Sequence, residues 1–155
     1  MKVKKICIKA LCVSVCLFFF SCASTPEKKI DSAYVMVYDY ENSEVMNVTI
    51  LIDGKTAGST DIYGRLMFAC DKEREVLIKA SKNGYETIEE KTVIKAGAVI
   101  YFKMGSGSYY AAKAEKLLDE RNVIGASKMI EKALAIEERK DWRYLQEIII
   151  KESNR

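Results

Sequence analysis

The sequence contains 155 residues, with 25 Lys and Arg against 22 Asp and Glu and with no His, which gives a formal net charge of +3. The lack of histidine excludes a histidine-based catalytic triad, an imidazole metal cluster and an imidazole general base. Of the five cysteines, only Cys70 lies beyond residue 22, so the main part of the chain cannot form an internal disulfide. Because Cys70 follows an apolar run, we expect it to be a small buried hydrophobe.

Residues 1–21 have the pattern of a secretory signal. Four lysines, Lys2, Lys4, Lys5 and Lys9, precede an apolar run over residues 10–20 that contains no charged side chain. A membrane-spanning helix needs about 20 apolar residues, and this run is too short for that. We therefore expect export of the chain and no permanent transmembrane anchor.

The apolar run ends in Phe19-Phe20-Ser21-Cys22, which resembles a bacterial lipobox, where a small residue precedes a cysteine. The resemblance implies that lipid is transferred to the thiol of Cys22 and that the chain is cleaved before it. Acyl chains anchor a protein durably, because each buried CH₂ contributes about 0.8 kcal/mol. The alternative is an ordinary signal peptide that is cut elsewhere and contains an incidental cysteine. After cleavage before Cys22, residues 22–32 form a polar lipidated tether.

Cleavage before Cys22 also changes the charge of the chain. It removes four lysines and no acidic residue, which leaves 21 basic against 22 acidic side chains and a net charge of −1. The basic excess therefore belongs to the export signal, and no binding to nucleic acid is expected.

Residues 33–104 show the period-two pattern of β-strands. Large apolar side chains alternate in residues 48–52, which predicts a strand with one buried face. The Asp53-Gly54 and Asn83-Gly84 pairs predict tight hairpins, because both positions of such turns favour positive backbone angles. We predict seven strands in a small antiparallel β-sandwich. They cover residues 33–40, 48–52, 56–60, 65–69, 76–82, 85–91 and 98–104.

Residues 48–55, 58–65 and 80–86 contain a turn of the form hydroxyl, Asp, two residues, Gly, followed later by a Gly-Tyr pair. This pattern resembles the PEGA and carboxypeptidase regulatory-like group of prealbumin-type sandwiches. The resemblance implies that Asp61 accepts backbone amides, that Gly64 takes a left-handed angle, and that Tyr85 packs at a sheet end. It also implies a non-catalytic adhesion, scaffold or ligand-presenting module of a cell envelope.

Residues 105–108, Gly-Ser-Gly-Ser, predict a flexible linker, beyond which the apolar period changes to about 3.6. We expect two or three helices in residues 109–155, with Ser108 as the first cap. The first two resemble a single tetratricopeptide-type hairpin. Because one hairpin cannot bury its own apolar face, Leu117, Ile130 and Leu134 are expected to contact the sandwich, a second copy or a protein partner.

The sequence thus predicts an α+β protein, in which a seven-strand sandwich precedes a helical segment. We interpret it as an envelope lipoprotein, facing the periplasm or the outside, that acts as a scaffold or protein-interaction module. Carboxylate pairs such as Glu89-Glu90 fit solvated faces, so we expect no enzymatic activity, no cofactor and no metal site. The alternative is a carbohydrate- or peptidoglycan-binding lipoprotein that presents Tyr34, Tyr38 and Tyr40 on one strand face.

Overall fold

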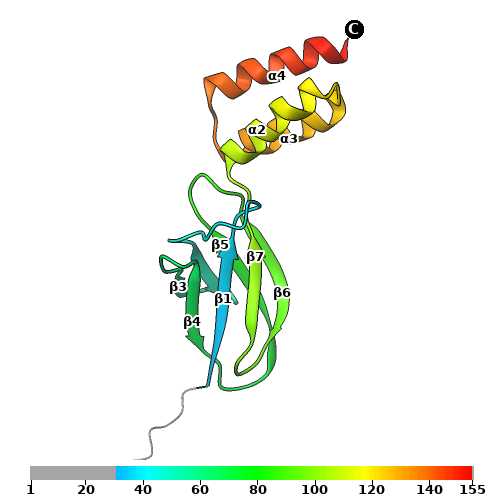
Figure 1. The fold of residues 1–155 in the computed structure, drawn as a ribbon. Coiled ribbons are helices and arrows are strands. Elements are labelled where there is room, and N and C mark those ends of the chain that lie inside the picture. Colours follow the sequence, from blue (N-terminus) through cyan, green and yellow to red (C-terminus); the bar gives the residue numbers. More distant parts are fainter. Residues whose placement is uncertain (1–30, 155) are drawn as a thin grey trace, which may run out of the picture.

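A computed structural model of the chain describes residues 31–154, as seven strands in two sheets followed by three helices (Figure 1). The seven strands and the C-terminal helices were predicted, and both are confirmed, so the fold class is α+β. Cys22 and the expected signal and tether positions up to residue 30 lie outside the described residues.

The three-stranded sheet has the order β4-β1-β7. Its strands are β1 (Ser32–Tyr38), β4 (Arg65–Ala69) and β7 (Val99–Lys103). The central strand β1 runs antiparallel to β4 and parallel to β7. The expectation of purely antiparallel pairing is therefore wrong for this sheet. The parallel pair is possible because β1 and β7 are joined by the whole of the intervening chain and by no hairpin.

The four-stranded sheet is antiparallel, with the order β3-β2-β5-β6. Its strands are β2 (Thr49–Ile52), β3 (Lys55–Ser59), β5 (Arg74–Ser81) and β6 (Ile88–Ile94). As predicted, Asp53 and Gly54 form the β2–β3 turn, with φ angles of 50° and 76°. This is the pattern of a tight hairpin with positive φ at both positions.

The second predicted hairpin differs from the expectation. Gly84 has a φ of 79°, and the Tyr85 amide donates to the Lys82 carbonyl over 3.1 Å, so a turn is present. However, β6 begins only at Ile88, three residues later than predicted. Tyr85 and Glu86 do not continue the sheet, because they pair with the segment that leads into the helices. A longer connection therefore replaces the tight hairpin.

Both sheets contribute side chains to one core. The alternating positions Ala33, Val35 and Val37 of β1 are fully buried, as the period-two pattern requires. They belong to the same cluster as Ile50 and Ile78 of the four-stranded sheet. Cys70 is also part of this core and is 3% exposed. The two sheets thus form a single body, to which we refer as the β body.

The three helices are α2 (Gly107–Asp119), α3 (Val123–Ile136) and α4 (Lys140–Ser153). The Ser106 hydroxyl, and not the expected Ser108, caps α2 by accepting the Tyr109 amide over 3.0 Å. Asn122 caps α3 in the same way through Gly125. In the described part of the chain, no helix is long and apolar enough to cross a membrane.

Small residues allow α2 and α3 to pack closely, as the sequence indicated. Ala114, Ala126 and Ala133 are fully buried between the helices, together with Ile130. Helix α4 closes this cluster with Trp142 and Ile149. The helices stand at one end of the β body and do not lie across a sheet (Figure 1). The helical unit thus has its own core.

Candidate functional site

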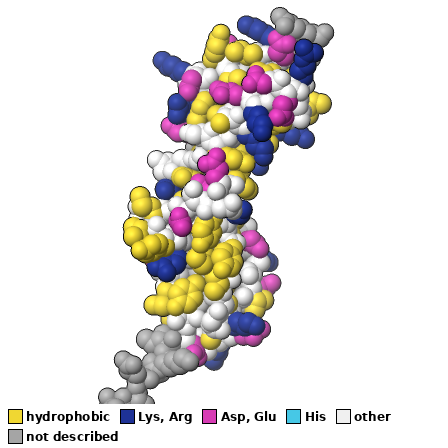
Figure 2. All heavy atoms as spheres, viewed as in Figure 1, with side chains coloured by type: hydrophobic (Ala, Val, Ile, Leu, Met, Phe, Trp, Pro, Cys, Tyr) yellow, Lys and Arg dark blue, Asp and Glu magenta, His cyan; other side chains and the backbone are white. Residues whose placement is uncertain are grey.

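The outer face of the three-stranded sheet is unusually apolar. Its outward positions place apolar side chains in register, and we call this surface the aromatic face. It consists of Tyr34, Met36 and Tyr38 of β1, Met67 of β4, and Val99 and Tyr101 of β7. Figure 2 shows hydrophobic side chains gathered on the β body, where Figure 1 places these strands.

The strand register makes this surface continuous. Tyr34 lies between Met67 on one side and Val99 on the other. One row further along, Met36 lies between Arg65 and Tyr101. Met67 and Tyr101, which lie on opposite sides of β1, are 61% and 65% exposed, which is high for large side chains of one apolar surface.

The outer face of the four-stranded sheet has the opposite character. Charged side chains alternate outward on β5 and β6, including Glu75, Lys79, Glu89 and Lys91. Lys79 and Glu89 are register partners, and their charged groups lie 3.6 Å apart. Charged side chains are well solvated, so one outer surface of the β body is polar and the other is apolar.

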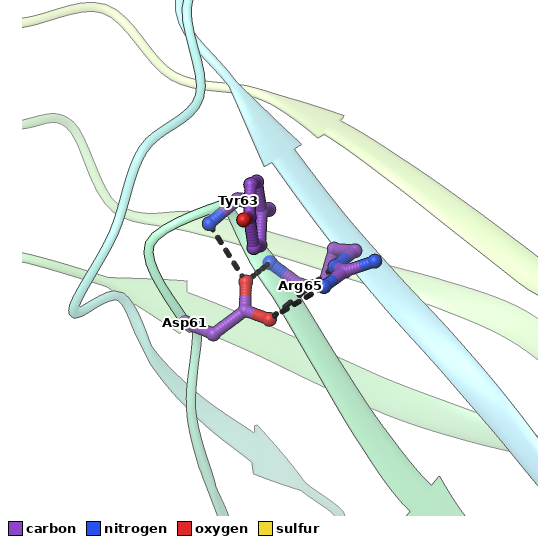
Figure 3. Close-up of polar contacts among 3 residues, drawn as sticks. All are labelled: Asp61, Tyr63 and Arg65. Carbon is purple, nitrogen blue, oxygen red and sulfur yellow. Dashed lines mark hydrogen bonds and ion pairs between the residues drawn. The ribbon is translucent and has the colours of Figure 1, made fainter.

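The turn before β4 leads into Arg65, the register partner of Met36 on the aromatic face, and Figure 3 shows its polar contacts. The Asp61 Oδ1 atom accepts the backbone amides of Tyr63 and Arg65, both over 2.9 Å, and Oδ2 pairs with the Arg65 guanidinium at 3.1 Å. The amide of Arg65 is the main cause that holds the pKa of Asp61 below its ordinary value, and the Arg65 side chain adds to it. The predicted roles of Asp61 and Gly64 (φ of 68°) are confirmed. Arg65 is therefore largely neutralised, and it also covers the Tyr63 ring.

A tyrosine cluster joins the β body to the helical unit. Tyr40 stacks on Tyr109 of α2 with ring centroids 5.2 Å apart, and Tyr110 contacts both rings edge-on. The Tyr110 hydroxyl donates to Glu86 Oε1 over 2.8 Å, and the Gly105 amide donates to the same oxygen. Burial raises the pKa of the Tyr110 hydroxyl, and the bond to Glu86 raises it further.

The predicted linker over residues 105–108 is tightly packed in this junction. A Cβ at Gly105 would lie 2.4 Å from the Tyr110 ring, and one at Gly107 would lie 2.7 Å from the Trp142 ring. Gly107 is already the first residue of α2, and its amide donates to the Gly84 carbonyl. Gly105 therefore allows the end of the β body to approach Tyr110 of α2 closely, and Gly107 allows α2 to approach α4.

The tyrosines singled out from the sequence do not share one surface. Tyr34 and Tyr38 point outward on β1, where Tyr38 stacks beside Tyr101 at 6.5 Å. Strand β1 ends at Tyr38, because the Asp39 carboxylate accepts the amides of Glu41 and Ser43 and turns the chain. Tyr40 consequently lies in the tyrosine cluster.

The helical positions singled out from the sequence lie mostly inside the helical unit. Ile130 is fully buried, and Leu117 and Leu134 are partly buried against the same cluster. Besides Tyr144, which is 65% exposed, two large aliphatic side chains remain outside: Ile124 and Ile150, which are 75% and 52% exposed. They line a groove of about 400 Å³ between α3 and α4.

Sequence reasoning missed Met67, Ile124 and Ile150, and it identified Tyr101 only as a further aromatic ring and not as part of the strand face. The outward orientation of Tyr101 could have been predicted, because Tyr101 has the same strand parity as Val99 and Lys103 in β7. Its place beside β1 depends on the parallel pairing, which no local pattern contains. Within residues 31–154, no group of three or more Cys, Asp or Glu side chains is placed to hold a metal ion.

No family model matches the sequence, and no curated protein matches it. Among solved structures, the Bacillus anthracis TIE protein is 14% identical with a TM-score of 0.41, over 49% of this chain and 16% of that one. BcpA, the major pilin subunit of Bacillus cereus, is 12% identical with a TM-score of 0.38, over 48% and 28%. The 3-chlorocatechol 1,2-dioxygenase of Rhodococcus opacus is 11% identical with a TM-score of 0.35, over 52% and 62%. In each case the match spans less than two thirds of the solved chain.

Proposed function

We propose that this chain is a lipoprotein of a bacterial cell envelope, acylated at Cys22 and held at a membrane surface by that lipid. The observation that carries the proposal is the order of elements at the start of the sequence: four lysines, an uncharged apolar run, and then Ser21-Cys22. The structure begins its first strand at Ser32, so a tether of about ten residues separates the acylated residue from the β body.

In this proposal the β body is a non-catalytic base of the PEGA or carboxypeptidase regulatory-like type, with a prealbumin-type sandwich. Two observations support it. Both sheets share one core, and the turn at Asp61 and Gly64 has the hydrogen bonds and the backbone angle that the motif implies. The function assigned to this base is to carry the helical unit at the envelope.

The helical unit is then the part that contacts another protein or a second copy of the chain. Its first two helices pack through small residues as in a tetratricopeptide-type hairpin, and α4 covers one side of it. The exposed Ile124 and Ile150 leave an apolar groove at the α3–α4 edge, which suits a partner helix. The glycan-binding alternative has less support, because Tyr40 is used in the junction and Tyr38 stacks on Tyr101.

Metabolic labelling tests the lipid anchor. Cells that express the full precursor are given a labelled fatty acid, and we expect the label on the protein and the protein in the membrane fraction. Cys22→Ser should abolish the label and release the protein, whereas the matched control Cys16→Ser, inside the apolar run, should retain both. Unchanged labelling of the Cys22→Ser protein would place the lipid on another residue, whereas the absence of label from the parent protein would mean that the signal is of the ordinary type.

A further inference from the structure

We propose that the aromatic face lies against the same bilayer that holds Cys22, with Tyr34, Met67 and Tyr101 in the headgroup region. This inference rests on the proposed acylation and adds an orientation to it. The β body would then rest on its three-stranded sheet and turn its four-stranded sheet toward water.

The first argument is the continuity of the face. Exposed apolar residues that stand alone are common on protein surfaces and require no explanation. Here the register places Met67, Tyr34 and Val99 in one row and Met36 beside Tyr101 in the next. The result is one continuous patch on three paired strands.

The second argument is the chemistry of the patch. Tyrosine has an apolar ring and a polar hydroxyl, and it is enriched where membrane meets water. Strands β1, β4 and β7 contain no Asp or Glu, so contact with lipid would bury no strand carboxylate. Of the two outward cations, Arg65 is paired with Asp61, and Lys103 donates to the Asn42 side chain over 2.8 Å at the edge. Asn42 carries no charge, so Lys103 keeps its positive charge and the net charge of the patch lies at its edge. The attraction of its apolar centre to lipid is therefore expected to depend little on salt.

The third argument is the length of the chain between the lipid and the face. Tyr34 lies twelve positions after Cys22, and a chain of this length spans at most about 40 Å when fully extended. A tether of this length keeps the face near the bilayer and raises its effective concentration there. Even a weak attraction of the face is then sufficient to orient the β body.

The test places a reporter on each outer face of the acylated, full-length mature protein. In a Cys70→Ala background, Met67→Cys and Val93→Cys each receive an environment-sensitive fluorophore. Val93 is the matched control, because it is 51% exposed and lies outward on β6 of the four-stranded sheet. The proteins are bound to phosphatidylcholine vesicles that contain lipids with a nitroxide quencher in the headgroup region.

We expect quenching at position 67 to be several-fold stronger than at position 93. Adding Tyr101→Glu, at a side chain that is 65% exposed, should reduce the quenching at position 67 without changing the circular dichroism. Equal quenching at the two positions, or none at either, overturns the inference. The aromatic face would then be a candidate surface for a protein partner. The mass of the purified protein reports its acyl groups independently: an acylated protein without the difference refutes this inference alone, whereas an unacylated protein refutes the proposed function as well.

Discussion

Thr60, Asp61 and Gly64 each have a separate role in the turn that precedes β4. The Thr60 hydroxyl, which is buried, accepts the Val48 amide and donates to the Val45 carbonyl. The Asp61 carboxylate accepts the amides that the turn leaves unpaired. Gly64 provides the left-handed angle at a point where the backbone of β1 is very close.

Two glycine substitutions separate backbone strain from close approach. Gly64→Ala is expected to lower the free energy of unfolding by about 2 to 4 kcal/mol, because φ is 68° and a Cβ would lie 2.5 Å from the Val37 oxygen. Gly84→Ala is the control, since φ is 79° but no atom lies within 4 Å, and it should cost about 1 kcal/mol. Urea unfolding followed by circular dichroism measures both values. Equal costs would show that the contact with β1 does not constrain the turn.

At the scale of residues, the sequence was sufficient to predict the roles of side chains whose hydrogen-bond partners lie close in the sequence. The Asp61 carboxylate accepts amides two and four residues away, so the motif alone was sufficient to predict its role. The first cap was placed on Ser108, although Ser106 performs that role. The helix begins earlier because Gly107 fits below the Trp142 ring, and α4 is remote in sequence.

At the scale of elements, alternation predicted where strands and helices occur but not how they pair. All seven strands lie within a few residues of their predicted positions. The period of two specifies which side chains face the core and contains no information on the neighbouring strand. The β1–β7 pair, and with it the joining of Tyr34 and Tyr101 in one face, therefore could not be derived.

The helical unit provides a test of its own core. Ile130→Asp is expected to destabilise this unit by more than about 3 kcal/mol, because it places a charge at a fully buried position. Ile124→Asp on the same helix is the control, and at 75% exposure it should change stability by less than about 0.5 kcal/mol. Thermal unfolding followed at 222 nm compares the two variants.

The same pair addresses the proposed partner. If the α3–α4 groove binds another protein or a second copy, Ile124→Asp should keep its melting temperature and lose the co-purifying protein or the dimer peak. A variant that melts normally and keeps every contact would place the partner surface elsewhere on the chain.

At the scale of the whole molecule, the junction decides how far the two parts depend on each other. The fragment of residues 23–106 keeps the whole β-body core and should fold cooperatively, with a lower melting temperature than the full chain because Tyr40 loses Tyr109 and Tyr110. The fragment of residues 107–155 has about 50 residues and should show reduced helicity, since domains near this size have small cores. Circular dichroism and sedimentation of both fragments measure this. A second fragment that is stably helical and monomeric would contradict the expectation.

The parallel pairing of β1 and β7 has a mechanical consequence. The chain enters β1 at one end of the β body and leaves β7 toward α2 at the other end (Figure 1). A pulling force applied between Asp31 and the helices therefore acts along these two neighbouring strands in opposite directions. It loads the hydrogen bonds of the whole register, from Tyr34↔Val99 to Tyr38↔Lys103, at the same time and in shear, and it cannot open them one by one. The topology thus makes the β body a link that resists tension between whatever holds its first strand and whatever binds its helices.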